Sequence, residues 1–509
     1  MRIVEGKIFK STIIISSFTL LTAIFNYLNL LLLAFSFGAG TEMDAFFAAT
    51  TVPQIITAIL LAVLTTTFIP VFIEAKSAEE SNAWKVASIS ANLIFLILFI
   101  IAILGTLFSH YIISLINPGF TGRSLTVSVS LFRILLVSLM FSGSSIIFTS
   151  LHYAHQRFFK PSLAQGVNSF ITFLFILNLR SSLGIKSIAI GTLLGSLFQF
   201  IYLLSIFLKK NRYSFEFDCK KKEIVKLAHL MLPLLIGSIF YKTNTLVERF
   251  IASKFGEGSI SYLGYAHKII MAFTLMISQG ISTVLFPRMS EYSAVKDFKA
   301  LKKILSKGIR VLIIITVPMV FMIIIAKYEL VQLLFERGNF SHQSTIAVGN
   351  ILIAYLGYFV VASISLPIIN TLYSLKETKK VAIVGISGFM IYVFLAFFLS
   401  QYLSYIGIAL AVSIQYIISM ILFIYIIKLK SIGFEERLIS LCILKTILAS
   451  GLSSLIILGS RRLLKSLIEY PFDLIFFAIL GFLLYFLILI IFKTKELKFI
   501  KINFPFLRK

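Results

Sequence analysis

Apolar runs of about twenty residues recur along the whole chain, and each is long enough to cross the hydrocarbon core of a bilayer as a helix. The chain has 509 residues, of which 59% are hydrophobic and 13% are charged, and its mean hydropathy is +0.99. A soluble protein needs a larger polar share to cover its surface. The runs are continuous rather than alternating, which favours helices over a transmembrane β-barrel. The sequence therefore predicts an all-α polytopic membrane protein.

We expect about fourteen transmembrane helices, with boundaries good to a few residues. The expected spans are 11–37, 44–73, 86–115, 127–150, 161–179, 184–208, 229–252, 259–286, 308–326, 345–374, 380–400, 404–427, 438–459 and 471–492. No segment is left over for a soluble catalytic domain, so we expect that the protein is not an enzyme. The first run is too long for a signal peptide and lacks a small-residue cleavage site, which indicates an uncleaved first helix.

The positive charges predict the orientation of the chain. The formal net charge is +26, and most of the 47 lysines and arginines lie in alternate connections and at the C-terminus. They include Lys209, Lys210, Arg212, Lys220, Lys221, Lys222 and Lys226 in one connection, Arg288, Lys296, Lys299, Lys302, Lys303, Lys307 and Arg310 in another, and Lys493, Lys495, Lys498, Lys501, Arg508 and Lys509 in the tail. By the positive-inside rule, these segments and both termini are cytoplasmic. A membrane location, rather than nucleic-acid binding, explains the charge.

The chain repeats itself at an offset of about 220 residues, which indicates two six-helix lobes. A Phe-Gly-x-Gly corner at 37–40 returns at 255–258, Pro70 returns at Pro287, and 151–170 resembles 371–390. We therefore expect an N-lobe at 1–210, a cytoplasmic linker at 211–228 and a C-lobe at 229–430. Residues 431–509 would form two further helices and a basic cytoplasmic tail. Two lobes with the same orientation suit alternating access around a site between them.

Each corner predicts a short external turn between the first two helices of a lobe. Gly38, Gly40, Gly256 and Gly258 suit the left-handed backbone that such a turn often needs. Asp44 follows the first turn, where it would either cap its own helix or form a gating pair with a cation across the cleft.

The corners and their surroundings resemble the MurJ/MviN lipid II flippase family, within the superfamily of multidrug and oligosaccharide-lipid exporters. The similar stretches are FGAGTEMDAFFAATTVPQ (37–54), TFIPVFIEAK (67–76), FGEGSISYLGYAHKII (255–270) and TVLFPRMSEYSA (283–294). The resemblance implies a flippase in the bacterial inner membrane. It would move an undecaprenyl-pyrophosphate-linked glycan, such as the peptidoglycan precursor lipid II, from the inner to the outer leaflet. It also implies that the last two helices form a groove for the isoprenoid tail; a packing or partner surface is the alternative.

The family holds the pyrophosphate with arginines on its first, second and eighth helices, and this chain departs from that pattern. Lys268 stands at the position of the eighth-helix arginine, and Asp44 matches a functionally important acid. The first-helix basic residue aligns with Asn29, and the basic pair after Pro53-Gln54 becomes Thr57 and Ala58. These losses favour a related cargo, such as an O-antigen or capsule unit, over lipid II itself.

Charged residues inside spans predict the substrate site, because a charge at the bilayer centre costs roughly 3 kcal/mol or more. Lys242 and Arg249 are about 10 Å apart along one helix face. With Lys268 they would attract the phosphates of a polyprenyl carrier. Glu248 would pair with Arg249 or Lys268. The alternative to a substrate role for these residues is that such an ion pair only locks two helices together.

Uncharged polar residues would complete the site. Hydrogen bonds to sugar hydroxyls would come from Asn29, Thr50, Gln54 and Thr57. We expect no metal and no cofactor, since His152 and His155 have no accompanying carboxylate or cysteine, and Cys219 and Cys442 indicate neither a disulfide nor a metal site. Cell-wall or polysaccharide synthesis enzymes are candidate partners. Two other functions stay open: a cation-coupled multidrug-type antiporter, and a non-transporting membrane scaffold.

Overall fold

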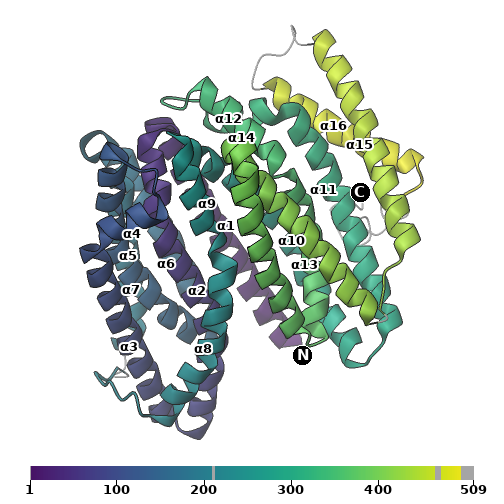
Figure 1. Cartoon of the computed structure of the whole chain (residues 1–509). Coiled ribbons are helices and arrows are strands. Elements are labelled where there is room, and N and C mark those ends of the chain that lie inside the picture. Colours follow the sequence, from purple (N-terminus) through teal and green to yellow (C-terminus); the bar gives the residue numbers. More distant parts are fainter. Residues whose placement is uncertain (1, 209–212, 431, 465–471, 495–509) are drawn as a thin grey trace. The chain divides into compact units, whose positions relative to one another are not determined.

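Every regular element in the described part of the chain is a helix (Figure 1). The computed structural model describes residues 2–208, 213–430, 432–464 and 472–494. The elements are α1 (Arg2–Phe37), α2 (Thr41–Ala78), α3 (Glu80–Leu107), α4 (Ser109–Ile116), α5 (Gly122–Ala154), α6 (Phe159–Leu183), α7 (Lys186–Leu208), α8 (Lys222–Lys242), α9 (Asn244–Ala252), the 3-10 turn η1 (Ser253–Phe255), α10 (Ser259–Ala294), α11 (Phe298–Phe335), α12 (His342–Ala354), α13 (Leu356–Ser374), α14 (Thr378–Leu429), α15 (Glu436–Leu464) and α16 (Phe472–Ile491). Lys209, Lys210, Arg212 and the tail from Lys495 onward lie outside the described residues.

Twelve helices of the described residues are long and apolar enough to cross a membrane, which confirms the all-α polytopic class. The count of about fourteen stays a prediction. Two predicted spans, 380–400 and 404–427, lie within α14, whose 52 residues are kinked at Ser404 with φ 54. A straight helix of that length would measure roughly 78 Å, more than twice the thickness of a bilayer core.

Several predicted spans are interrupted in the structure. The span predicted at 229–252 breaks at Thr243 into α8 and α9. The spans predicted at 86–115 and 345–374 likewise break at Phe108 and Tyr355. Hydrophobicity alone does not reveal the breaks at Phe108 and Tyr355, because both halves of these two spans are apolar.

The contacts between helices divide the chain into two compact units. The first unit contains residues 1–261 and the short segment 337–341, and the second contains 262–336 and 342–509. In the first unit α5 packs against α2, α3 and α7, and α8 packs against α2. The helix α7 also packs against α6, and small residues let the two helices lie close, as is common between transmembrane helices. A methyl group on Gly195 of α7 would lie only 2.3 Å from Oδ1 of Asn168 on α6. The predicted lobe boundaries stay a prediction.

In the second unit α11 packs against α12, α13, α15 and α16. The Tyr485 hydroxyl of α16 donates to the Ile314 carbonyl of α11 at 2.8 Å. Arg461 of α15 forms ion pairs with Glu329 of α11 at 2.9 Å and with Asp473 of α16 at 3.1 Å. The Arg461 guanidinium therefore ties the last two helices to α11, because its two terminal nitrogens contact two different carboxylates.

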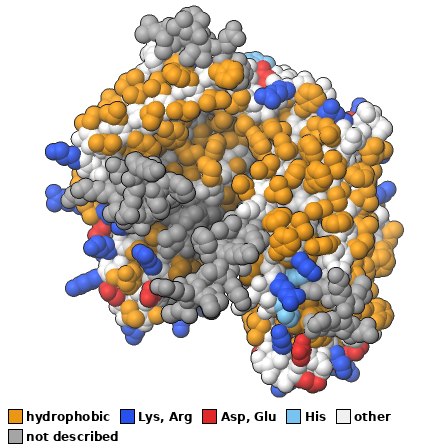
Figure 2. Space-filling model, turned by 180° about the vertical axis from the view of Figure 1, so that it is seen from behind, with side chains coloured by type: hydrophobic (Ala, Val, Ile, Leu, Met, Phe, Trp, Pro, Cys, Tyr) orange, Lys and Arg blue, Asp and Glu red, His pale blue; other side chains and the backbone are white. Residues whose placement is uncertain are grey.

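The surface in Figure 2 shows broad areas of hydrophobic side chains, with the charged side chains gathered toward the margins. Large apolar side chains such as Leu107, Phe394 and Ile491 are more than three-fifths exposed, at 69%, 69% and 65%. A soluble monomer rarely exposes apolar areas of this extent, so these side chains are suited to face lipid.

Replacing Arg461 with Ala is expected to lower the free energy of unfolding by about 2 kcal/mol, because two carboxylates lose their cation in a partly buried place. Hydrogen exchange in α16 should rise in the variant, measured by mass spectrometry on the purified protein. Arg437→Ala changes an exposed arginine of the same helix and is the matched control. Equal exchange in both variants would contradict the anchoring role.

Candidate functional site

Both corners are turns between helices, as their glycines predict. Gly38, Gly256 and Gly258 have positive φ values of 65, 89 and 88, in the region that favours glycine. Gly40 differs, because its φ of −107 is one that any residue can adopt. A glycine is needed there for space. A Cβ on Gly40 would lie 2.8 Å from Oε1 of Glu257, so glycine lets the second corner approach the first.

Asp44 caps a helix other than its own. Its Oδ2 accepts a hydrogen bond from the Gly258 amide at 2.6 Å, and its Oδ1 accepts from the Ser261 amide at 2.7 Å and from the Ser261 hydroxyl. These are donors at the N-terminus of α10, where backbone amides lack intrahelical partners. The carboxylate is buried, with 2% of the residue exposed. The prediction that Asp44 caps its own helix is therefore wrong, because α2 has Gly40 at its N-cap and no side-chain cap.

Glu257 of the second corner caps α2 in return. Its Oε1 accepts from the Thr41 amide at 2.8 Å and from the Thr41 hydroxyl. The hydrogen bond from the Thr41 hydroxyl, reinforced by that from the amide, holds the pKa of Glu257 below its ordinary value of 4.5. The N-terminus of each helix is thus capped by a carboxylate from the opposite corner. We call Thr41, Asp44, Glu257, Gly258 and Ser261 the reciprocal cap.

The C-terminus of α1 is capped by a third segment, residues 337–341. The Asn339 amide donates to the Phe35 carbonyl at 2.9 Å, and the Asn339 side chain donates to the Ser36 carbonyl at 2.6 Å. Gly338, with φ 61, passes so close that a Cβ would lie 2.3 Å from the Phe35 oxygen. The sequence analysis missed this cap. The Gly-Asn pair at 338–339 marks a tight turn, but nothing local indicates its distant partner.

Arg249 and Glu248 lie beneath the corners and are buried, with 6% and 8% of each residue exposed. Arg249 pairs with Glu248 at 3.1 Å and donates from Nη1 to the Ile260 carbonyl at 3.1 Å. Its guanidinium also lies over the Phe47 ring, 5.4 Å from the centroid. The ion pair lies within α9, and the hydrogen bond to the Ile260 carbonyl is what links α9 to α10. The substrate role of Arg249 stays a prediction.

The two deep lysines are exposed. Lys242 is the last residue of α8, and α9 begins two residues later, so its ammonium lies at the break in this predicted span. Interrupted membrane helices often mark binding sites in transporters. Lys268 lies on the part of α10 that belongs to the second unit, next to His267, whose ring contacts Tyr355 and Tyr358 at centroid distances of 5.8 and 6.1 Å.

The uncharged candidates differ in access. Asn29 is buried and donates to the Ser169 carbonyl at 3.1 Å, and its Oδ1 has no partner among the described residues. Thr50 is buried and donates to its own helix at Phe47, at 3.0 Å. Thr57 donates to Pro53 at 2.8 Å and is half-buried, whereas Gln54 is exposed. Gln54 and Thr57 are therefore the accessible members of this set.

Comparison with known proteins identifies the family. Residues 33–483 match the family model described as lipid II flippase MurJ. The chain belongs to this family. A probable lipid II flippase MurJ of Buchnera aphidicola subsp. Schizaphis graminum is 27% identical over 418 residues, covering 80% of this chain and 81% of the relative. One of Rickettsia prowazekii is 26% identical over 463 residues, covering 88% and 90%.

Solved structures agree on the fold. The chain is similar to a lipid II flippase MurJ in an inward closed conformation, with a TM-score of 0.82 and 24% identity over 95% of this chain and 100% of that chain. A multidrug resistance transporter of the MATE family, inward-facing, gives a TM-score of 0.70 at 15% identity over 81% and 95%. The predicted MurJ/MviN family is confirmed. The chain is a multi-pass protein of the bacterial inner membrane in a family of lipid flippases, and the antiporter is not favoured.

Replacing Asp44 with Ala is expected to lower the free energy of unfolding by about 2 to 3 kcal/mol, because two helix-terminal amides and a hydroxyl lose a charged acceptor in a buried place. The fluorescence of Trp84, the single tryptophan of the chain, can follow thermal unfolding in detergent. Asp44→Asn retains one acceptor oxygen and should lose less. Glu42→Ala breaks only an exposed pair with Arg123 and is the control, with an expected loss below about 1 kcal/mol. A loss for Asp44→Ala no larger than for Glu42→Ala would rule out the capping role.

The cap on α2 should weaken in acid. Because the folded-state pKa of Glu257 is lowered, its contribution to stability is fully present above the ordinary value of 4.5 and is lost as the pH falls through the lowered value. The melting temperatures of the wild type and Glu257→Gln should therefore differ at about pH 6 and converge as the pH falls through the lowered pKa of Glu257. A difference that stays constant with pH would show that the charge of Glu257 contributes nothing.

Proposed function

We propose that the chain moves an undecaprenyl-pyrophosphate-linked glycan of the lipid II class from the inner to the outer leaflet by alternating access. In this proposal the reciprocal cap lies at the external ends of the helices, and both termini are cytoplasmic. The observation that carries the proposal is the reciprocal cap itself. It joins the two corners, which occupy equivalent places in the sequence repeat, so it is suited to hold that side closed while the other side admits a lipid.

The energy of this closure is suited to reversible opening. Asp44 accepts three hydrogen bonds and Glu257 accepts two, all from groups that water can satisfy after opening. At a net value of about 1 kcal/mol each, they contribute roughly 5 kcal/mol. A ligand that binds one state better by about 5.5 kcal/mol would move a two-state equilibrium from 1:99 to 99:1. A phosphate-bearing cargo attracted by cations can supply a difference of this size.

Lys242 and Lys268 are the cations that we expect to hold the phosphates. Both ammonium groups are exposed, whereas Arg249 is committed to Glu248 and the Ile260 carbonyl. Gln54 and Thr57 are accessible for sugar hydroxyls, and Asn29 and Thr50 would become so only after the helices move. Two lysines and a set of neutral polar residues suit one anionic group beside neutral sugars, which includes lipid II and related polysaccharide precursors.

The rival functions fit less well. A cation-coupled antiporter would depend on a deep carboxylate, yet Glu248 is paired with Arg249 at 3.1 Å. A non-transporting scaffold has no need of exposed lysines deep in two predicted spans, since each costs free energy in a bilayer. Synthesis enzymes of the cell wall or of a polysaccharide remain candidate partners for the flippase.

Reconstitution into liposomes tests the proposal with fluorescent undecaprenyl-pyrophosphate glycans, scored by their accessibility to a membrane-impermeant quencher. Lys242→Ala and Lys268→Ala are each expected to slow flipping about tenfold or more, because a cation–phosphate contact worth about 1.4 kcal/mol is lost. Lys226→Ala is the matched control, since this lysine forms an exposed surface pair with Glu74.

The outcomes separate the site from the function. Unchanged flipping in both lysine variants would contradict the site while leaving the transport function intact. If the wild type flips no lipid-linked glycan, the function itself is wrong. Faster flipping of a polysaccharide precursor than of lipid II would identify the cargo as the former.

A further inference from the structure

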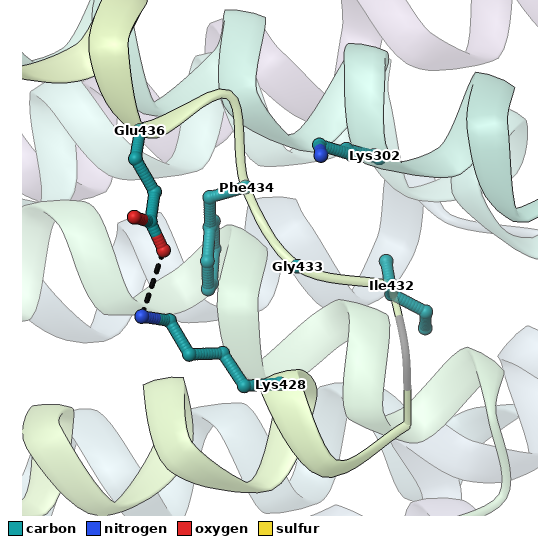
Figure 3. Close-up of a pocket in the computed structure, with 6 residues that line it drawn as sticks. All are labelled: Lys302, Lys428, Ile432, Gly433, Phe434 and Glu436. Carbon is teal, nitrogen blue, oxygen red and sulfur yellow. Dashed lines mark ion pairs between the residues drawn. The ribbon is translucent and has the colours of Figure 1, made fainter.

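An open pocket of about 430 Å³ lies in the second unit, on the side that the positive-inside rule predicts to be cytoplasmic (Figure 3). Its walls come from α11, the end of α14, the connection to α15 and the start of α15. The lining residues are Lys302, Lys428, Ile432, Gly433, Phe434 and Glu436. None of them takes part in the site proposed above.

Residues 432–435, just before the start of α15, are held by packing, a hydrogen bond and an ion pair. Ile432 and Phe434 point inward, with 2% and 8% of each residue exposed. The Glu435 amide donates to the Ser306 hydroxyl of α11 at 2.9 Å, and its carboxylate pairs with Arg310 at 3.3 Å. The backbone beside the pocket is therefore fixed by buried side chains and by its contacts with α11.

Gly433 leaves the backbone of this connection open to a ligand. It has a φ of 58, and a Cβ there would meet only the Lys302 ammonium, at 4.0 Å. Figure 3 shows Lys302 and Lys428 on either side of the connection. A group lying over Gly433 would therefore have a cation on each side.

The positive charge at the pocket is only partly compensated. Lys428 pairs with Glu436 at 2.7 Å, but both side chains are more than half exposed, at 51% and 64%, so the pair is weak and exchangeable. Lys302 has no ion pair or hydrogen bond with any described residue. By contrast, Lys430 and Lys380 nearby share Glu377. The N-terminus of α15 adds the positive end of a helix dipole. The pocket therefore favours an anion.

An apolar stripe on α14 leads to this pocket. Ile421, Tyr425 and Leu429 are spaced by four residues, so they share a face, and they are 59%, 59% and 61% exposed. Lys428 lies three residues after Tyr425 on the same side of the helix. On the first turns of α15, Leu438 and Leu441 are also exposed. A ligand with one anionic head and a long apolar chain matches this layout, whereas free phosphate would leave the stripe unused.

We propose that Lys302, Lys428 and the backbone at Gly433 bind the phosphate of an anionic phospholipid, whose acyl chain lies along Ile421, Tyr425 and Leu429. The phosphate replaces Glu436 as the partner of Lys428 and gives Lys302 a partner. The site takes a lipid of the surrounding bilayer and does not depend on the transported cargo.

Native mass spectrometry of the full-length protein in detergent tests this site by titration with phosphatidylglycerol and, in parallel, phosphatidylcholine. The double variant Lys302→Gln/Lys428→Gln is expected to weaken the tightest phosphatidylglycerol binding about 10- to 30-fold, because each lysine near a lipid phosphate contributes to binding. Phosphatidylcholine binding should not change. Lys303→Gln, a neighbouring exposed lysine outside the pocket, is the matched control and should bind like the wild type.

Glu436→Gln provides an independent test, because removing the competing carboxylate should strengthen phosphatidylglycerol binding. A gain of affinity cannot come from misfolding. Equal phosphatidylglycerol affinity in the wild type and the double variant would overturn the proposal. Displacement of the lipid by inorganic phosphate at an equal concentration would also overturn it, since the site would then hold a soluble anion.

Discussion

The backbone amides at the start of a buried helix need acceptors, and the corners of this protein are arranged around that need. A helix-terminal amide that is buried without an acceptor costs free energy, as it would for the buried partners of Asp44. The N-termini of α2 and α10 meet the requirement by exchange, as Glu257 serves one and Asp44 serves the other. At the C-terminus of α1, the carbonyls of Phe35 and Ser36 accept hydrogen bonds from Asn339. Three helix termini are thus complete only when segments far apart in the sequence meet.

This dependence explains why closure can be both specific and reversible. Each carboxylate lies at the positive end of a helix dipole, where a negative charge is stabilised. When the corners part, water hydrates both the carboxylates and the amides, so opening loses only the net value of the hydrogen bonds. Arg249 of α9 adds a further contact, because its hydrogen bond to the Ile260 carbonyl holds the first turn of α10. An apolar contact of equal free energy would not require donors and acceptors to align, so it would specify the closed arrangement less strictly.

The sequence predicted the features that depend on local chemistry. Apolar length indicated the helices, and the glycines located both turns, with Gly38, Gly256 and Gly258 in the left-handed region. The partner of Asp44 was not predictable, because the acceptor and its donors are more than 200 residues apart and any of several helix termini lacked a cap. The break at Thr243 was also not predicted, since the apolar run around it is continuous enough to read as one span. The roles of Lys242 and Lys268 stay predictions.

The two halves of the sequence repeat share the Phe-Gly-x-Gly corner but differ in the chemistry around it. At the repeat offset, Asp44 corresponds to Tyr262 and Glu257 corresponds to Ala39, so each half carries one acid at a position where the other has none. A symmetric arrangement with acids at both positions would bring like charges together at one small contact, which costs free energy. Each corner supplies one carboxylate to the helix terminus of the other, and Glu42, the second acid of the first corner, pairs with Arg123 instead. The proposed substrate residues are also distributed unevenly along the sequence, with the lysines Lys242 and Lys268 on α8 and α10 and the uncharged residues on α1 and α2.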